Sequence, residues 1–337
     1  MKNSSQSVAF FIGIDVSKLT LDVTVINSQT KTRKYKQIEN STSGLNAMDT
    51  WLKNQALFNY ANALFCFEHT GMYTRVLLGY LLSKNARVWM ESSLQIKKSL
   101  GLNRGKNDKI DAHRIAEYAY RFSDKAKLVI NNSDEIFILK DFLSARARLK
   151  KSLQQIAVTI KELKKVDLEQ GKEIEMLNLH ALRGMKKSIE QIEAKIQQII
   201  ESHKRLKEVY QLTTSIPGVG FILATKLLVY TKVFTSFDNV RQLACYCGVA
   251  PFEYRSGTSV KGRTGVSKFA NMDLKATLHL AAISAIQHNA ELKQYYERKV
   301  EEGKSKMAVI NAVRNKLLAR IVAVVNRNTP YVQLTHN

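Results

Sequence analysis

The chain has 337 residues, of which 45% are hydrophobic, so it can bury the cores of two or three domains. Three prolines and fifteen glycines exclude a collagen-like or largely disordered chain. The 52 Lys and Arg residues outnumber the 29 Asp and Glu residues and leave a net charge of +23. A fold does not require this excess, which therefore predicts a polyanionic partner, DNA or RNA, in preference to a membrane surface.

The cysteines and apolar runs indicate the compartment. Cys66, Cys245 and Cys247 are too few for a disulfide framework, and Cys-x-Cys without further ligands is a poor zinc pattern. The first apolar run ends at an aspartate and is too short for a signal peptide, and no run of about 18 apolar residues follows. We expect a cytoplasmic protein of the bacterial cytosol or nucleoid, with no membrane partner.

Residues 1–133 predict a mixed α/β domain. Strand-like stretches come first, at residues 8–17, 21–27 and 32–40. Apolar strands at 62–70 and 86–92 then alternate with helical stretches. This is the element order of a ribonuclease H-like domain, a mixed sheet with helices on its faces.

Four acids in this domain are candidates for a metal site. Asp15 and Glu68 lie near the ends of two predicted strands, and Asp108 and Asp111 share one face at the start of a helix. Four converging carboxylates repel one another unless cations lie between them, and two Mg²⁺ ions suit oxygen ligands and phosphodiester chemistry.

Each acid also has an ordinary explanation. A strand-end aspartate commonly caps a turn, and Asp22 has as good a chemical claim as Asp15. Asp108 alone would be explained as a helix N-cap, with Asp111 favouring the helix dipole.

Residues 134–210 change to a heptad pattern. Apolar residues step by four and three over 149–163, and again over 185–199 after a polar break near Gly171. The pattern predicts a coiled-coil region, formed either by a helical hairpin or by pairing between chains. A helical linker with a charged, solvated face is the alternative.

Residues 211–337 predict a mainly helical domain. The "SIPGVG" stretch resembles a helix-hairpin-helix element, in which Gly218 and Gly220 would let backbone N–H groups approach a phosphate. The stretch from 247 to 271 is loop-like and basic. Its Ser256 is one hydroxyl among several, and Tyr254, Thr258, Ser259 and Ser267 compete with it.

Eight basic residues are candidate nucleic-acid contacts, because they surround the paired aspartates or Ser256. They are Arg104, Lys106, Lys109, Arg114, Arg255, Lys261, Arg263 and Lys268. Cations at this density hold a phosphate and stabilise the charge that develops during strand cleavage.

A rival for the first domain is an actin- or sugar-kinase-like ATPase. "GIDVS" resembles the phosphate-binding start of that fold. The rest of the sequence lacks its further glycine-rich phosphate loops, and the ATPase reading leaves "NDKIDAHR" unexplained.

Five segments together resemble the insertion sequence 110 family of DNA transposases, whose relatives include a pilin-gene invertase. They are "FIGIDVSKLTLDVTV", "CFEHTGMYT", "GLNRGKNDKIDAHRIAEYA", "SIPGVGFILATKLL" and "LACYCGVAPFEYRSGTSVKGRTGVSKFAN". They occur in the family's order over roughly residues 9 to 325. Individually "GID" and "PGVG" are weak signals, and the combination is specific.

The resemblance implies a RuvC-like catalytic domain with a DEDD metal site at Asp15, Glu68, Asp108 and Asp111. It also implies a coiled coil that links subunits and a C-terminal transposase domain in which Ser256 is the nucleophile. Family members act as dimers and tetramers, in which the serine of one subunit completes the metal site of another. A non-coding bridge RNA pairs with donor and target DNA.

The leading hypothesis is therefore an RNA-guided DNA recombinase that moves an insertion sequence. A site-specific invertase of the pilin type uses the same chemistry without integration. A RuvC-like junction nuclease would hydrolyse with water and not need Ser256. A decayed transposase kept for nucleic-acid binding is the non-enzymatic alternative.

Overall fold

The computed structural model describes residues 8–68, 71–101, 107–129, 134–256, 260–266 and 270–332, with the backbone alone at 134 and 253–264. Its contacts divide the chain into two units, residues 1–131 and 132–337. The division into three domains at 133/134 and 210/211 stays a prediction. Within the described ranges, no helix is long and apolar enough to cross a membrane.

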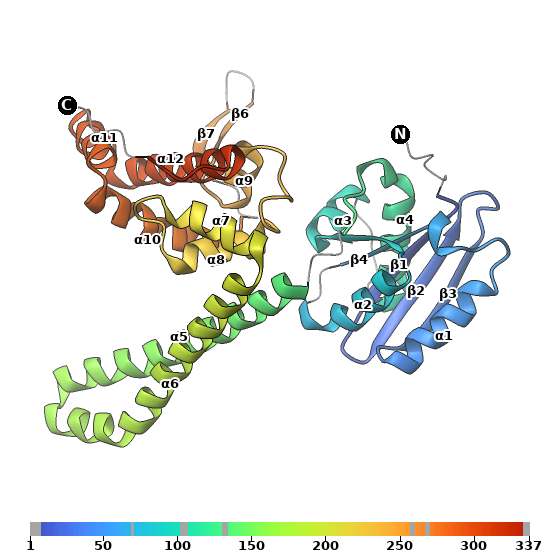
Figure 1. Ribbon diagram of the computed structural model, residues 1–337, viewed down its shortest axis with the longest axis horizontal. Coiled ribbons are helices and arrows are strands. Elements are labelled where there is room, and N and C mark those ends of the chain that lie inside the picture. The colour runs from blue at the N-terminus through green and yellow to red at the C-terminus, as the bar shows by residue number, and fades with distance from the viewer. Residues whose placement is uncertain are drawn as a thin grey trace. The chain divides into compact units, whose positions relative to one another are not determined.

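The N-terminal unit is built on a five-stranded mixed sheet in the order β3-β2-β1-β4-β5 (Figure 1). β1 pairs antiparallel with β2 and parallel with β4, and β2–β3 is antiparallel while β4–β5 is parallel. The strands are β1 Phe10–Val16, β2 Thr20–Asn27, β3 Arg33–Glu39, β4 Ala63–Glu68 and β5 Arg87–Glu91. This arrangement fits the expected ribonuclease H-like domain.

Helices cover both faces of this sheet. α1 (Thr42–Lys53) and α2 (Arg75–Ser83) follow the strands on one side, and α4 (Asp108–Arg121), with α3 (Ser93–Ser99) beside it, packs on β1, β2 and β4 on the other. Short 3-10 turns complete the unit: η1 Tyr60–Asn62, η2 Gly71–Thr74 and η3 Ser123–Lys125.

Gly13 in β1 sets how closely α4 approaches the sheet. A Cβ atom at this position would lie 2.1 Å from the Ala116 nitrogen and 2.5 Å from the Ala112 carbonyl oxygen. Only a residue without a side chain allows the helix backbone to rest on the strand backbone here.

The cap of α4 is Asn107. Its side chain accepts a hydrogen bond of 2.8 Å from the Ile110 N–H, which satisfies one of the unpaired donors of the first turn. The N-cap explanation for Asp108 is therefore wrong, because Asp108 is already the first helical residue. Asp108 and Asp111 both lie in the first turn, where the helix dipole favours negative charge.

Two long helices, α5 (Asp134–Val166) and α6 (Leu168–Ser202), pack along each other as an antiparallel pair (Figure 1). The break between them is at Asp167, the N-cap of α6, rather than near Gly171. Gly171 instead allows close contact, because a Cβ there would lie 2.8 Å from Lys164 backbone atoms. An ion pair of 2.6 Å joins Arg146 to Glu193 across the pair.

The remaining helices form an α-helical body with its own apolar core. They are α7 Lys204–Thr214, α8 Phe221–Tyr230, α9 Val240–Tyr246, α10 Met272–His288, α11 Ala290–Glu301 and α12 Lys306–Arg327. Leu223, Leu227, Leu278, Leu317 and Ile321 are among its fully buried side chains.

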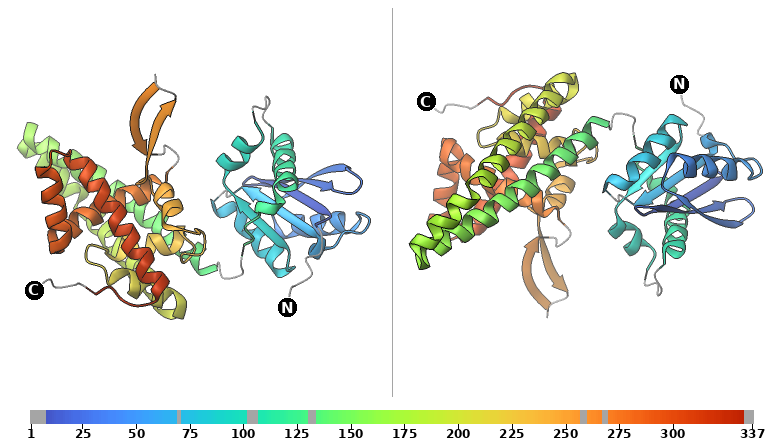
Figure 2. Two further views of the ribbon diagram at one scale, coloured as in Figure 1. Left: turned by 90° about the horizontal axis from the view of Figure 1, so that it is seen from above. Right: turned by 90° about the horizontal axis from the view of Figure 1, so that it is seen from below.

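The stretch predicted to be loop-like contains two strands, β6 (Pro251–Ser256) and β7 (Val260–Val266). They pair antiparallel and project from the helical body (Figure 2). The expectation of a loop was wrong because it relied on glycines and charges, which an exposed strand pair tolerates.

Candidate active site

Asp15 and Glu68 belong to a row of acids that crosses the sheet at one level and on one face. The row consists of Asp22, Asp15, Glu68 and Glu91. Asp15 of β1 lies directly opposite Asp22 of β2, so the two side chains share a face. The parallel register of β1 with β4 runs up to the residues just before Asp15 and Glu68, which therefore follow as neighbours. Glu68 in turn pairs with Glu91 of β5.

This face is the one that α4 covers. Gly13 faces Ala112 and Ala116, and Asp15 lies two residues further along the strand, so it faces the same helix nearer its start. Asp108 lies one turn before Ala112 on that helix face. The fold thus brings Asp15, Glu68, Asp108 and Asp111 from two strands and one helix to a common end of the domain.

The charges of these acids act on one another. Burial first, and then the neighbouring carboxylates of Asp108, Asp111, Glu68 and Asp22, together raise the pKa of Asp15 from 3.8 to about 6. Mutual repulsion of this kind is typical of sites that bind cations or exchange protons.

Among the four predicted metal ligands, Glu68 and Asp111 contact other side chains. The Ser93 hydroxyl donates a hydrogen bond to Glu68, and Arg114 forms an ion pair of 3.0 Å with Asp111. No group of three or more His, Cys, Asp or Glu side chains is close enough to hold a metal ion in the described part of the chain. The acids are therefore neighbours by fold and by charge, while two of their side chains engage other groups.

The donor set fits a divalent metal. Hard cations such as Mg²⁺ prefer carboxylate oxygens, and a cation at this point would relieve the repulsion that raises the pKa of Asp15. To hold the ion, Glu68 and Asp111 would give up their contacts with Ser93 and Arg114.

Two outer acids of the row are held by hydrogen bonds. Asp22 is buried and accepts hydrogen bonds from the Tyr35 hydroxyl and from Gln37 at 3.2 Å. Glu91 accepts a hydrogen bond of 2.7 Å from the Ser92 N–H and one of 3.3 Å from the Tyr118 hydroxyl of α4. These contacts hold both carboxylates in place, and the charge of Asp22 contributes to the raised pKa of Asp15.

Sequence reasoning named Asp22 as a competitor and overlooked Glu91. The signal that found Glu68, a carboxylate at the end of an apolar strand, is also present in "ARVWMES" and would have found Glu91. The sequence gives no comparable signal for Ser93.

Ser256 is the last residue of β6 and pairs with Val260 of β7. Its side chain, like that of Tyr254, falls outside the described atoms. Thr258, Ser259 and Ser267 lie outside the described residues altogether. The helical body holds the base of the strand pair: Asn311 and Asn315 of α12 both donate to the Val249 carbonyl, at 2.8 and 2.7 Å.

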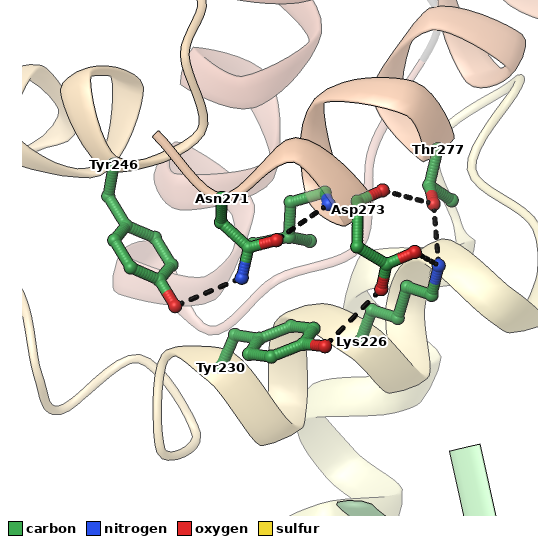
Figure 3. Close-up of polar contacts among 7 residues, drawn as sticks. Lys226, Tyr230, Tyr246, Asn271, Asp273 and Thr277 are labelled. Carbon is green, nitrogen blue, oxygen red and sulfur yellow. Dashed lines mark hydrogen bonds and ion pairs between the residues drawn. The ribbon is translucent and has the colours of Figure 1, made fainter. Parts of the chain in front are cut away.

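The two ends of the segment that contains β6 and β7 are also tied together. The Asn271 backbone N–H donates to the Tyr246 carbonyl at 2.7 Å. The Asn271 side chain also donates to the Tyr246 hydroxyl at 3.0 Å (Figure 3). Asn271 also caps α10 by accepting from the Leu274 N–H. One residue therefore joins the end of α9 to the start of α10.

A second set of contacts in Figure 3 ties α8 to α10. Lys226 donates to Asp273 at 2.5 Å and to Thr277 at 2.8 Å, and the Tyr230 hydroxyl donates to Asp273 at 3.3 Å. Burial, and then Asp273, raise the pKa of Tyr230 to about 12. Tyr230 is therefore a neutral donor that braces the body and is unsuited to act as a nucleophile.

The other predicted contacts are distributed as follows. Lys109 is exposed on α4, and Arg114 is half-buried beside Asp111. Arg104, Lys106 and Lys268 lie outside the described residues, and for Arg255, Lys261 and Arg263 only the backbone is described.

The two glycines of "PGVG" differ in their surroundings. Gly218 has a φ of +88° and packs against α10, where a Cβ would lie 2.6 Å from that of Ala285. This contact accounts for the glycine without a phosphate. Gly220 is exposed at the start of α8, with no atom within 4 Å of a Cβ placed there. A phosphate contact at either glycine stays a prediction.

Two transposase families match parts of this chain. A transposase family of the IS110 DEDD type matches residues 12–165, and the IS116/IS110/IS902 transposase family matches residues 210–297. The chain belongs to the IS110 family of transposases. It is therefore a DNA-recombining enzyme, and its DEDD domain implies dependence on a divalent metal.

Relatives of this IS110-family transposase include an invertase. The pilin gene-inverting protein of Moraxella lacunata is 27% identical over 97% of this chain and 98% of its own length, as is that of Moraxella bovis. An uncharacterized 43.6 kDa protein of insertion element IS110 from Streptomyces coelicolor is 30% identical over 42% of this chain and 33% of its own.

Proposed function

We propose that this transposase moves an insertion sequence by cutting DNA through Ser256, with two Mg²⁺ ions held by Asp15, Glu68, Asp108 and Asp111. The observation that supports it is the convergence of the four acids on one end of the α4-covered face, with the pKa of Asp15 raised to about 6. When bound, the metal would offset the negative charge of the scissile phosphate, of the attacking serine oxygen and of the leaving oxygen.

The step at the serine follows from its chemistry. The Ser256 oxygen attacks phosphorus, a P–O bond forms to the protein, and the bond to the 3′ oxygen breaks, which releases a 3′-hydroxyl. A serine hydroxyl needs a base or a coordinated metal ion to become nucleophilic. The sequence around Ser256 supplies cations but no histidine or aspartate at triad spacing. The carboxylate site would meet this need.

The proposal further assigns RNA guidance and subunit sharing. A bridge RNA encoded by the element would pair with donor and target DNA, and the chain would act as a dimer or tetramer in which Ser256 of one subunit serves the acids of another. The positive charge of +23 supports a partner set of DNA and RNA.

The decisive experiment is recovery of a covalent protein–DNA adduct. The wild-type protein, supplied with Mg²⁺, the co-purified RNA and donor DNA, should form an adduct that resists detergent. Ser256→Ala should bind the nucleic acids normally and form none, whereas the matched controls Ser259→Ala and Ser267→Ala should keep it. An adduct from Ser256→Ala would reject the serine assignment, and full strand cleavage without any adduct would favour a junction nuclease.

Two further measurements test the remaining parts. Sequencing of RNA that co-purifies with the protein should return one defined species from the element's non-coding region, and random cellular RNA would contradict guidance. Mixing Ser256→Ala with Asp108→Ala subunits should restore cleavage that neither has alone. Subunit sharing would be contradicted if this mixture does not cleave DNA while mixtures of each variant with wild-type protein do.

Site-specific inversion is the second candidate function. It is favoured by the similarity to pilin gene-inverting proteins over nearly the whole of both chains. A plasmid that carries the gene with its flanking genomic DNA distinguishes the two functions. An excised or inserted element supports transposition, and a reversed segment supports inversion.

A further inference from the structure

A basic pocket lies beside the carboxylate site. It has a volume of about 490 Å³ and opens between α4 and the strands β2 and β3. Its charged lining consists of four cations and one acid: Arg33, Lys109, Arg114, Arg121 and Glu117. The formal charge of this lining is +3, which is concentrated in one concave region of the N-terminal unit.

The single acid holds two of the cations in place. Glu117 pairs with Arg33 at 2.9 Å and with Arg121 at 2.6 Å, and its side chain is 15% exposed while theirs are 51% and 59% exposed. The carboxylate therefore lies at the back and the guanidinium groups lie toward solvent. One negative charge fixes two positive groups, so donors and charge remain for a ligand.

The other cations have different anchors. The Lys109 ammonium lies 4.9 Å from the centre of the Tyr35 ring, a cation–π contact that leaves its charge uncompensated. Within the described residues, Lys109 has no carboxylate partner. His113, which also lines the pocket, contacts Arg33 through its Nε2 atom.

The pocket and the acids share two residues. Arg114 lines the pocket and pairs with Asp111 at 3.0 Å, and Tyr35 lines it and donates to Asp22 in the acid row. Arg114 and Tyr35 therefore connect the pocket to the acids.

We propose that this pocket binds backbone phosphates of the DNA strand on one side of the scissile phosphate. The assignment rests on the proposed function, because it takes the acids as the place where the strand is cut. Arg33 and Arg121 present guanidinium planes that match phosphate oxygens, and Lys109 adds a point charge at the pocket wall. The pocket thus positions the strand and reads no base sequence.

The test measures binding separately from cleavage. Fluorescence anisotropy of the full-length protein with labelled single-stranded DNA, duplex DNA and single-stranded RNA is recorded over a range of KCl. The test variant is Arg33→Gln with Arg121→Gln. Lys53→Gln with Lys84→Gln is the matched control, because it removes the same charge from the part of the unit formed by α1 and the end of α2.

Loss of two phosphate contacts should weaken single-stranded DNA binding by about tenfold and reduce the slope of log K against log salt by about 1.4. The control pair should change neither the affinity nor the salt slope by more than about twofold. Equal losses in both pairs would overturn the proposal, because they would reflect overall charge. A loss confined to RNA would also overturn it and assign the pocket to RNA.

Lys109→Gln keeps the result interpretable if the double variant does not fold. It leaves both pairs of Glu117 intact and should reduce the salt slope by about 0.7. An unchanged slope would count against the pocket. Failure of the proposed function has a different signature: the variants lower the salt slope as predicted, but the wild-type protein forms no serine adduct.

Discussion

Replacement of Asp15 by asparagine should make the protein more stable and inactive at once. The side chain is held among other carboxylates, so its ionised form is unfavourable in the folded state. Asparagine has nearly the same shape and no charge, so it removes the repulsion. It also removes a proposed metal ligand, and strand cleavage should fall to background.

The size of the effect follows from the pKa of Asp15. A rise from 3.8 to about 6 corresponds to about 3 kcal/mol at 1.36 kcal/mol per pH unit. Because the carboxyl is half-buried, solvent screening reduces this to about 1–2 kcal/mol. For a domain of this size, such a gain raises Tm by about 4–8 °C.

The pH dependence has a defined sign. Between pH 3.8 and about 6 the folded protein holds a proton on Asp15 that the unfolded chain has lost, so wild-type stability falls as pH rises through this window. The advantage of Asp15→Asn should be full at pH 7.5, smaller at pH 5 and absent below pH 4.

The assay is thermal unfolding followed by circular dichroism in EDTA at these pH values. Asp49→Asn is a control of opposite sign. Burial alone would raise the pKa of Asp49, but hydrogen bonds from Lys53 and Tyr60 lower it, so this variant should lose stability at pH 7.5. If Asp15→Asn melts at or below wild type at pH 7.5 while the control behaves as expected, the repulsion argument is wrong. Added Mg²⁺ should raise the Tm of wild type more than that of Asp15→Asn.

Two further substitutions test how the sites are supported. Gly13→Ala would place a Cβ 2.1 Å from the Ala116 nitrogen, so α4 must move away and stability should fall by about 1–3 kcal/mol in urea unfolding; an unchanged midpoint would contradict the close contact. Asn311→Ala with Asn315→Ala removes both donors to the Val249 carbonyl, so adduct formation should slow by at least about tenfold with DNA affinity unchanged; an unaltered rate would show that the base of β6–β7 needs no such anchor.

The strand ends carried much of the predictable information. Asp15 and Glu68 stand out because a charged residue closes an apolar stretch, and the five strands follow from their patterns. The row with Asp22 and Glu91 depends on strand register, which is set by connections whose geometry a sequence pattern does not give.

Other parts of the site depend on contacts between distant segments. Asn311 and Asn315 reach Val249 from more than sixty residues away, and an asparagine on a helix surface gives no sign of such a partner. The cap of α4 was predictable, since Asn107 precedes the helix with the usual chemistry of a cap. The prediction instead offered Asp108 as the cap, because two aspartates follow Asn107.

The contact of α4 with β1 through backbone atoms has a consequence for substitutions on α4. The depth of the helix is set by main-chain atoms that every residue type possesses, so substitutions on the outer surface of α4 leave the separation of its aspartates from Asp15 unchanged. Substitution of Lys109 or Arg121 on α4 should therefore alter the pocket without altering the spacing between the acids. Gly13 thus makes the position of the acids independent of the side chains on the outer surface of α4.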